Sequence, residues 1–353
     1  MEKIIVLTGG GTGGHVIPNL SLIPYLKKHF DKIYYLGTNG IEKELTKGKV
    51  DEFFEIEACK FDRERIFKNA LLPFKMLKNV HMCKRILQKI KPDIIFAKGG
   101  YVSLPVCIAG RKLKIPIVAH ESDLSIGKAN KIICRLSKKF CTTFEKTAES
   151  LKKGVFTGSP IRKELFLGDI EKGKKMTGFD MSREVIMFVG GSTGAKALNE
   201  AVWNSIDELT KKYDVIHLTG KGKNMQKKVP HYYQAEFCKN IQDLLKISSV
   251  VVSRAGSNAI YEFLALNKPM LLVPLPKGNS RGDQVENAKY FEEKSFAKVL
   301  YQENLTKENL LKSIEQMLKE KDAIKQNLSS QDKEKFTHGA ENITKEILNS
   351  LKE

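Results

Sequence analysis

The chain has 353 residues, which is long for one hydrophobic core and predicts two domains of about 150 to 200 residues each. Its 60 Lys and Arg against 41 Asp and Glu give a formal net charge of +19, so we expect an acidic partner: nucleic acid, an anionic membrane face or a phosphorylated substrate. Six cysteines without a Cys-x-x-Cys pair argue against zinc and disulfide frameworks, and no run of 18 apolar residues predicts a membrane span. We therefore expect a cytosolic chain.

Short apolar runs with strand character alternate with longer segments of helical period. In the first half these runs are residues 4–7, 32–36, 93–97 and 115–119. After a weakly patterned stretch the alternation restarts with runs at residues 184–189, 214–218, 248–252 and 270–273. This alternation predicts α/β architecture: two Rossmann-like domains, each with a doubly wound parallel sheet, facing a shared cleft.

The domain limits follow from the same alternation. We predict a first domain at residues 1–163 and a second at residues 164–335. Residues 336–353 form a final helix whose apolar stripe, Ile343, Ile347 and Leu351, suits packing back on the first domain.

The first apolar run ends in a glycine-rich turn, Gly9-x-Gly11-x-x-Gly14, which fits the dinucleotide pattern of a strand, a tight turn and a helix. The pattern alone is weak. A nicotinamide enzyme should also carry Asp or Glu at the end of the second strand, whereas residues 34–39 contain none. This absence disfavours a dehydrogenase.

His15 directly follows these glycines, at the expected start of a helix. The positive helix end would lower its pKa and leave the ring neutral and able to accept a proton. The alternative is a histidine that only packs the turn. A third glycine turn at residues 99–103 follows another predicted strand, and there Gly100 and Tyr101 are candidate substrate contacts, with a structural turn as the alternative.

The second half repeats the arrangement. The turn at residues 190–195 precedes an amphipathic segment, so Ser192 and the neighbouring amides are expected to hold a diphosphate. Arg162 is the expected charge partner of that diphosphate, because a guanidinium forks across paired oxygens, although a surface arginine is the alternative. A further turn at residues 253–258 leads to Glu262, whose carboxylate suits ribose hydroxyls, and residues 282–287 carry groups that suit sugar hydroxyls.

Residues 68–91 carry seven basic side chains and no acidic one. Met76, Val80, Cys83, Leu87 and Ile90 have the period of a core face. The side chains left for solvent or lipid are Leu71, Leu72, Phe74, Lys75, Lys78 and Arg85. Basic residues beside exposed apolar ones suit an anionic membrane surface, and a solvated helix is the alternative.

Seven motifs in chain order resemble one enzyme family, the bacterial glycosyltransferases of family 28 that use UDP-GlcNAc and an undecaprenyl-linked acceptor. The motifs are residues 10–18, 99–105, 120–123, 158–162, 190–195, 253–256 and 283–288. The resemblance spans nearly the whole chain. It implies a GT-B fold and inverting transfer of GlcNAc to the MurNAc 4-hydroxyl of lipid I, giving lipid II for peptidoglycan synthesis. It also implies a peripheral protein at the cytoplasmic face of the cell membrane, docked through residues 68–91. From the glycine-loop amides, the helix dipole and Arg162 we expect that no cofactor is required, and a divalent cation is possible but not indicated.

The resemblance also implies roles at matching positions. Thr12, Gly13, Gly14 and His15 border the sugar and the acceptor diphosphate, and Arg162 and Ser192 approach the donor diphosphate. Around the nucleoside it places Ile241 on the uracil together with Ser257, Asn258, Ala259 and Glu262, and on the donor sugar it places Gln284 and Asn287. Many members read His-Glu-Gln-Asn where this chain has His120-Glu121-Ser122-Asp123, so a carboxylate, Asp123, stands where an asparagine would contact the sugar.

For the chemistry, His15 is the first candidate for the general base, with Glu121 and Asp123 behind it. The nearest rival function is another GT-B enzyme with a UDP-sugar, either a diacylglycerol glycosyltransferase or a UDP-GlcNAc 2-epimerase. A nucleotide-sensing or nucleic-acid-binding protein is a rival that only the charge suggests, and no RNA-binding motif supports it, so we expect no nucleic acid.

Overall fold

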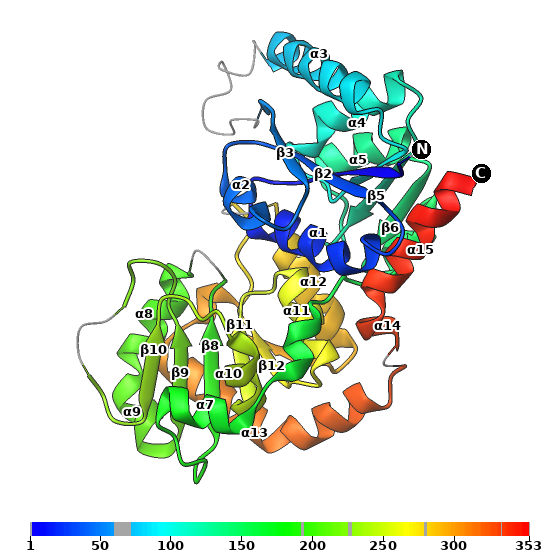
Figure 1. The fold of residues 1–353 in the computed structure, drawn as a ribbon. Helices are drawn as coiled ribbons and strands as arrows, with labels where there is room; N and C mark the ends of the chain where they lie inside the picture. Colours follow the sequence, from blue (N-terminus) through cyan, green and yellow to red (C-terminus); the bar gives the residue numbers. More distant parts are fainter. Residues whose placement is uncertain are drawn as a thin grey trace. The chain divides into compact units, whose positions relative to one another are not determined.

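The computed structural model describes residues 2–59, 72–191, 194–224, 228–278, 281–332 and 334–352. The chain forms two compact units (Figure 1). Unit 1 comprises Met1–Ile161 and Glu334–Glu353, and unit 2 comprises Arg162–Lys333. Each unit has one parallel sheet surrounded by helices, which confirms the predicted fold class.

The sheet of unit 1 is built around β1, whose backbone pairs with β2 on one side and β4 on the other. Its described strands, in spatial order, are β3 (Glu52–Glu55), β2 (Lys32–Gly37), β1 (Ile4–Thr8), β4 (Ile94–Ala97), β5 (Ile117–Glu121), β6 (Lys139–Thr142) and β7 (Gly154–Phe156). β5 begins two residues later than predicted because Ile115 is still part of the preceding turn, where its N–H donates to the carbonyl of Gly110. All these pairings are parallel, so the loops that carry the motifs gather at the carboxyl edge of the sheet.

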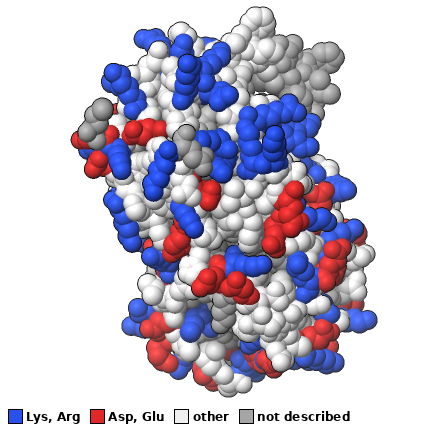
Figure 2. Space-filling model, turned by 90° about the vertical axis from the view of Figure 1, so that its right-hand side faces the viewer, with Lys and Arg blue, Asp and Glu red and all other residues white. Residues whose placement is uncertain are grey.

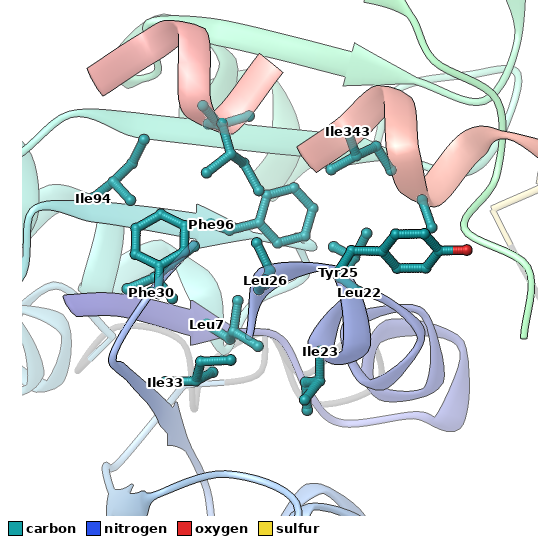
Figure 3. Close-up of a cluster of buried hydrophobic side chains, with 14 of the residues drawn as sticks. Leu7, Leu22, Ile23, Tyr25, Leu26, Phe30, Ile33, Ile94, Phe96 and Ile343 are labelled. Atoms are coloured by element: carbon teal, nitrogen blue, oxygen red, sulfur yellow. The ribbon is translucent and has the colours of Figure 1, made fainter. Parts of the chain in front are cut away.

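The helices of unit 1 cover both faces of its sheet (Figure 1). They are α1 (Gly13–Leu26), α2 (Ile41–Thr46), α3 (Leu72–Ile90), α4 (Ser103–Lys112), α5 (Lys128–Leu136), α6 (Glu145–Glu149), α14 (Glu334–Thr337) and α15 (Gly339–Lys352). α15 packs against α1 and the central strands. Figure 3 shows the core they share, where Leu22 and Leu26 of α1 lie close to Phe96 of β4 and Ile343 of α15. Ile343 is fully buried, which contributes about 1.5–3 kcal/mol toward holding α15 in place.

The sheet of unit 2 has the same parallel plan. Its described strands, in spatial order, are β10 (Tyr232–Ala235), β9 (Asp214–Leu218), β8 (Val185–Val189), β11 (Val250–Ser253), β12 (Met270–Leu272) and β13 (Ala297–Val299). Its helical segments are η2 (Lys163–Leu167), α7 (Ile170–Thr177), α8 (Lys196–Asn204), α9 (Ile206–Lys212), α10 (Ile241–Ile247), α11 (Ser257–Ala265), α12 (Asp283–Glu293), η3 (Gln302–Asn304) and α13 (Lys307–Ser329). The amphipathic segment after residue 195 is interrupted at Ser205, a buried residue whose hydroxyl bonds back to the carbonyl of Ala201.

The positive charge is unequally divided between the units. Unit 1 carries 32 Lys and Arg against 19 Asp and Glu, and unit 2 carries 28 against 22. Figure 2 shows one face on which Lys and Arg side chains crowd over unit 1, whereas both signs are interspersed over unit 2. An attraction to an anionic surface should therefore act mainly through unit 1.

Candidate functional site

The first glycine turn connects β1 to α1 in a space that admits no larger residue. Gly11 has a φ of +80°, and a Cβ there would lie 2.7 Å from the ring of Tyr101. A Cβ on Gly9 would lie 2.7 Å from the carbonyl oxygen of His15. The turn is thus closed by its own helix and by the glycine turn that follows β4, which brings these two predicted loops together.

A buried carboxylate, Glu42 of α2, lies beneath this turn. Its oxygens accept the N–H of Gly11 at 3.2 Å and the N–H of Thr38 at 2.9 Å. Sequence reasoning missed Glu42, because an acidic residue in the first turn of a short helix is ordinarily solvent-exposed. Its contribution is positional: it fixes the loop whose remaining groups face outward.

His15 lies in the first turn of α1. Its Nδ1 is 3.0 Å from the hydroxyl of Thr12, and its backbone N–H donates to the Thr12 carbonyl at 3.1 Å. On the opposite edge of the ring, Nε2 lies 3.3 Å from where a Cβ on Gly100 would stand. A side chain at position 100 would therefore crowd Nε2, so glycine there lets the loop after β4 approach the ring, and Thr12 contacts the opposite edge.

The segment after β5 is held by Glu121. Its two carboxylate oxygens accept the N–H groups of Ser122, Asp123 and Gly127 and the side-chain amide of Asn130, at distances from 2.9 to 3.1 Å. Glu121 is buried and its oxygens are engaged by these donors. This arrangement suits a group that shapes the loop better than a group that takes a proton from substrate. Asp123 is half-buried at the same loop.

Two further residues of this network were missed from the sequence. Asn130 of α5 accepts the N–H of Gly100 at 3.1 Å and donates to Glu121 at 2.9 Å, so it links the loops after β4 and β5. Lys98, immediately after β4, is buried and hydrogen-bonds the hydroxyl of Ser122. A lysine beside two glycines gives no sequence signal of burial, since lysine is almost always exposed.

His120, the first residue of the His-Glu-Ser-Asp segment, is fully buried. Its Nε2 lies 3.2 Å from the carbonyl oxygen of Gly158. Burial and the neighbouring charge of Lys98 hold its pKa well below the ordinary value, so the ring stays neutral near pH 7. Its role is to hold the end of β5 against the residue 158 turn.

In unit 2 the structure brings Arg162 and Glu262 together. Nε and Nη2 of Arg162 donate to one carboxylate oxygen of Glu262 at 3.2 and 3.1 Å. The side chains are 33% and 19% exposed, so the pair is partly shielded from water. Burial raises the pKa of Glu262 while Arg162 opposes that rise. The two residues predicted to serve the donor diphosphate and the ribose therefore form one charged pair.

The glycine turn before α8 is closed on one side and open on the other. Gly194 has a φ of +70° and packs against the carbonyl of Thr219, where no Cβ would fit. A Cβ on Gly191, by contrast, would meet nothing within 4 Å. The backbone is thus approachable just before a helix N-terminus, the geometry that suits phosphate oxygens. Ser192 lies outside the described residues.

The predicted nucleoside and sugar residues lie at three helix starts of unit 2. Ile241 begins α10, and Ser257, Asn258 and Ala259 form the first turn of α11 after Gly256, beside which a Cβ would meet nothing within 4 Å. Two side chains at the start of α12 already form hydrogen bonds within unit 2. Gln284 accepts the N–H of Leu275 at 3.0 Å, and Asn287, fully buried, donates to the carbonyl of Ala255 at 3.2 Å.

The basic helix α3 presents the surface that its sequence suggests. Val80, Cys83 and Leu87 are buried, whereas Phe74 is 72% exposed. Lys75, Lys78 and Arg85 are exposed and Leu72 is half-buried, and Leu71 lies outside the described residues. Leu77, which the sequence left unassigned, is 62% exposed beside them. Over the described ranges, helices with the length and apolar character for crossing a bilayer are absent.

Two family models match the chain. The glycosyltransferase family 28 N-terminal domain matches residues 5–142, and the glycosyltransferase family 28 C-terminal domain matches residues 185–343. The matched segments fall in units 1 and 2, with the second extending into α15.

Curated relatives match over almost the whole length. A UDP-N-acetylglucosamine–N-acetylmuramyl-(pentapeptide) pyrophosphoryl-undecaprenol N-acetylglucosamine transferase from Clostridium tetani (strain Massachusetts / E88) is 44% identical over 350 residues, 97% of each chain. A relative of the same name from Staphylococcus aureus (strain JH9) is 46% identical over 333 residues, 92% of this chain and 94% of the relative.

Solved structures share the fold at lower identity. MurG of Acinetobacter baumannii superposes with a TM-score of 0.75 at 22% identity, covering 99% of this chain and 100% of that one. The UDP-GlcNAc 2-epimerase of Neisseria meningitidis bound to UDP-GlcNAc superposes with a TM-score of 0.65 at 16% identity, covering 99% of each chain. Both likenesses concern the GT-B fold, and the fold alone does not separate a transferase from an epimerase.

Proposed function

This chain belongs to glycosyltransferase family 28, and from that membership we propose that it transfers N-acetylglucosamine from UDP-GlcNAc to the lipid-linked acceptor lipid I, forming lipid II for peptidoglycan synthesis. The observation that carries the proposal is the identity of 44–46% to transferases of that activity along nearly the whole chain. The transfer inverts the configuration at C1 of GlcNAc. The MurNAc 4-hydroxyl oxygen attacks C1 while the bond from C1 to the UDP oxygen breaks.

The acceptor half of the reaction is assigned to unit 1. As the hydroxyl attacks, its proton passes to Nε2 of His15, which lies beside Gly100. For Nε2 to carry the lone pair, Nδ1 must hold the proton and donate it to the Thr12 oxygen, which lies 3.0 Å away. Gly13, Gly14 and Tyr101 border the acceptor, and Asp123 stands at the sugar side of the loop that Glu121 shapes.

The donor half is assigned to unit 2. The departing UDP gains negative charge, which the open backbone at Gly191, the N-terminus of α8 and the guanidinium of Arg162 would stabilise. Glu262 serves the ribose and at the same time orients Arg162. Ile241 and residues 257–259 surround the nucleoside. Gln284 faces the sugar, and Asn287 supports the turn at Ala255.

A lipid-borne acceptor requires the protein to reach a membrane surface. We assign this contact to α3, where the exposed Phe74 and Leu77 lie among exposed lysines. Anionic headgroups attract each nearby Lys or Arg by about 1 kcal/mol, and apolar side chains add burial in the interface. The protein would thus act as a peripheral protein at the cytoplasmic face of the cell membrane, where UDP-GlcNAc is available.

We further propose that no resident metal or cofactor takes part, because Arg162 and the helix N-terminus offer positive charge to the departing diphosphate. Turnover should then be unchanged when purified protein is treated with EDTA. A loss of turnover that Mg²⁺ or Mn²⁺ restores would contradict this assignment.

The proposed function is tested by acceptor-dependent release of UDP. Purified protein with UDP-GlcNAc should release UDP only when a lipid I analogue is added, and the product should carry one additional GlcNAc by mass. Diacylglycerol in place of lipid I is the matched control and should give no release. Transfer to diacylglycerol, or conversion of UDP-GlcNAc to its manno epimer, would instead assign the chain to one of the two rival GT-B activities.

A further inference from the structure

Lys98 is a buried cation among the loops of unit 1. It follows β4 directly, its side chain is 1% exposed, and its backbone N–H donates to the carbonyl of Thr8 at 2.9 Å. Its Cβ lies 3.1 Å from where a Cβ on Gly9 would stand, and its ammonium hydrogen-bonds the hydroxyl of Ser122. Lys98 therefore touches both the first glycine turn and the loop after β5.

A buried ammonium is costly unless negative charge lies nearby. Burial lowers the pKa of Lys98 to about 8, and the carboxylates of Glu121 and Asp123 act in the opposite direction and favour its charged form. Among the described residues, the other titratable group that interacts with this ammonium is His120, which is buried and neutral. The local charge balance is thus one cation between two carboxylates.

One of these carboxylates, Glu121, orders the loop that borders the proposed acceptor site. Glu121 accepts the N–H groups of Ser122, Asp123 and Gly127, and through Asn130 it is linked to the N–H of Gly100, beside His15. A disturbance of the charge balance at Lys98 would therefore reach Gly100, beside His15, through four consecutive hydrogen bonds.

We propose that Lys98 is a positioning residue for acceptor transfer, whose buried ammonium compensates the carboxylate of Asp123 and thereby holds the Glu121–Asn130 loop network in its working geometry. The inference rests on the proposed function and deepens it. It also accounts for the departure at position 123: an aspartate can stand in place of the amide because Lys98, whose ammonium bonds the adjacent Ser122, places a buried cation at the same loop. Lys98 and Asp123 then form a functional pair, in which the aspartate is harmful without the lysine.

A double-mutant cycle tests the pair. Lys98→Met should lower kcat/KM for a lipid I analogue at least tenfold, because the carboxylates of Glu121 and Asp123 then lose the buried cation that balances them. Asp123→Asn alone should have a smaller effect, because Glu121 still balances the ammonium of Lys98. The double variant should recover most of the loss caused by Lys98→Met, since the neutral pair leaves only Glu121 charged. The matched control is Lys28→Met, an exposed lysine of the same unit, which should behave like the unaltered protein.

Affinity for UDP-GlcNAc, measured by calorimetry, should stay unchanged throughout the cycle because the donor residues lie in unit 2. If the fold-losses of kcat/KM in the two single variants simply multiply in the double variant, the proposed pairing is wrong. A Lys98→Met variant with unaltered acceptor kinetics would overturn the positioning role. If Lys98→Met is poorly folded, Lys98→Gln, which keeps a donor for Ser122 without the charge, takes its place in the cycle.

The pH profile separates this role from a merely structural one. Below about pH 8 Lys98 is charged and balances Asp123, and above that pH it is neutral, so acceptor kcat/KM should fall as the pH rises through 8. The Lys98→Met variant should lack this alkaline fall. Lys268 of unit 2 also has a pKa lowered to about 8. If the alkaline fall in kcat/KM persists in Lys98→Met, it is assigned to Lys268 and the inference is wrong.

A readout without turnover keeps the inference independent of the proposed function. Hydrogen–deuterium exchange of the peptide covering residues 121–130 should accelerate in Lys98→Met and return toward the original rate in the double variant. If the unaltered protein fails to extend lipid I while this exchange pattern holds, the proposed function fails and the Lys98–Asp123 pairing stands. If transfer is observed and exchange does not respond to Lys98→Met, the pairing fails alone.

Discussion

The two units place a glycine turn at the same position of the same kind of sheet, yet they treat that turn differently. In unit 1 the turn is enclosed: Glu42 binds its backbone, Tyr101 covers Gly11, and the neighbouring loop is gathered by Glu121. In unit 2 the backbone at Gly191 and Gly256 has open space beside it.

This difference indicates how one fold supports two tasks. A unit that uses backbone amides to hold a diphosphate must leave them accessible, as around Gly191. In the proposed function, a unit that holds a proton acceptor in one orientation instead engages its amides with buried carboxylates and sets the imidazole beside a glycine. We therefore expect changes in unit 1 to affect turnover and changes in unit 2 to affect nucleotide affinity.

The largest effect should come from His15→Ala. Removing a general base typically costs 10²- to 10⁴-fold in rate, so kcat should fall by about that factor. Affinity for UDP should not change, because the donor residues belong to unit 2. An assay of UDP release measures kcat, and calorimetry measures UDP affinity separately.

The control is His29→Ala, which removes an exposed histidine of the same unit and should leave both quantities unaltered. Equal losses of turnover and UDP affinity in His15→Ala would break the division of tasks and reduce His15 to a structural residue.

The second effect concerns the membrane. Reversal of Lys75, Lys78 and Arg85 to Glu should weaken binding to vesicles that contain anionic lipid by roughly 100-fold, at about 1 kcal/mol for each charge lost. Lys78 contributes least, because Glu57 lies 3.4 Å from its ammonium. Vesicle sedimentation at low salt measures the change.

The matched control makes the same charge change on unit 2, by reversing the exposed Lys172, Lys175 and Lys221. Attraction through net charge alone predicts equal losses in both variants, whereas docking through α3 predicts a loss in the first only. Phe74→Ser should add a further loss that salt does not affect, since the contact of this side chain is apolar.

The third effect tests unit 2. Arg162→Ala should weaken UDP binding roughly 30-fold, which corresponds to about 2 kcal/mol for a charge-assisted contact. Part of this loss of UDP affinity arises because the partly shielded carboxylate of Glu262 is left without its partner. The double variant Arg162→Ala, Glu262→Gln should therefore recover some of the affinity. Arg162→Lys keeps the charge without the fork and should give an intermediate affinity. Unchanged UDP affinity in Arg162→Ala would remove Arg162 from the donor site.

The sequence predicts the fold well because the strands are continuous apolar runs between helices of clear period. The predicted run at residues 214–218 is β9 itself, and the other predicted strands begin within two residues of the observed ones. The same regularity predicts the apolar stripe of the last helix, where Ile343 and Ile347 are buried.

The sequence predicts the site less completely, because its supporting groups come from positions that no local pattern marks. Glu42, Lys98 and Asn130 each act by reaching a loop that is distant in the chain, so only the assembled sheet edge reveals them. The pairing of Arg162 with Glu262, 100 residues apart, is likewise a tertiary contact between two residues that the motifs mark separately.

The smallest of the expected effects concerns how His15 is held. Thr12 Oγ1 lies 3.0 Å from Nδ1, and a base at Nε2 requires this oxygen to accept the Nδ1 proton. Thr12→Val preserves the shape of the side chain and removes the acceptor, which should cost about 1 kcal/mol and roughly fivefold in kcat. Thr12→Ser keeps the oxygen and should retain most of the activity.

The direction of the change in kcat distinguishes the two possible roles of Thr12. If Thr12 accepts the Nδ1 proton, its loss releases the tautomer that leaves the lone pair on Nε2, so kcat should fall in Thr12→Val and be retained in Thr12→Ser. If Thr12 instead donates to Nδ1, then Nε2 carries the proton and cannot be the base. In that case Thr12→Val would leave kcat unchanged or raise it, and the proton acceptor of unit 1 would have to be sought at Asp123.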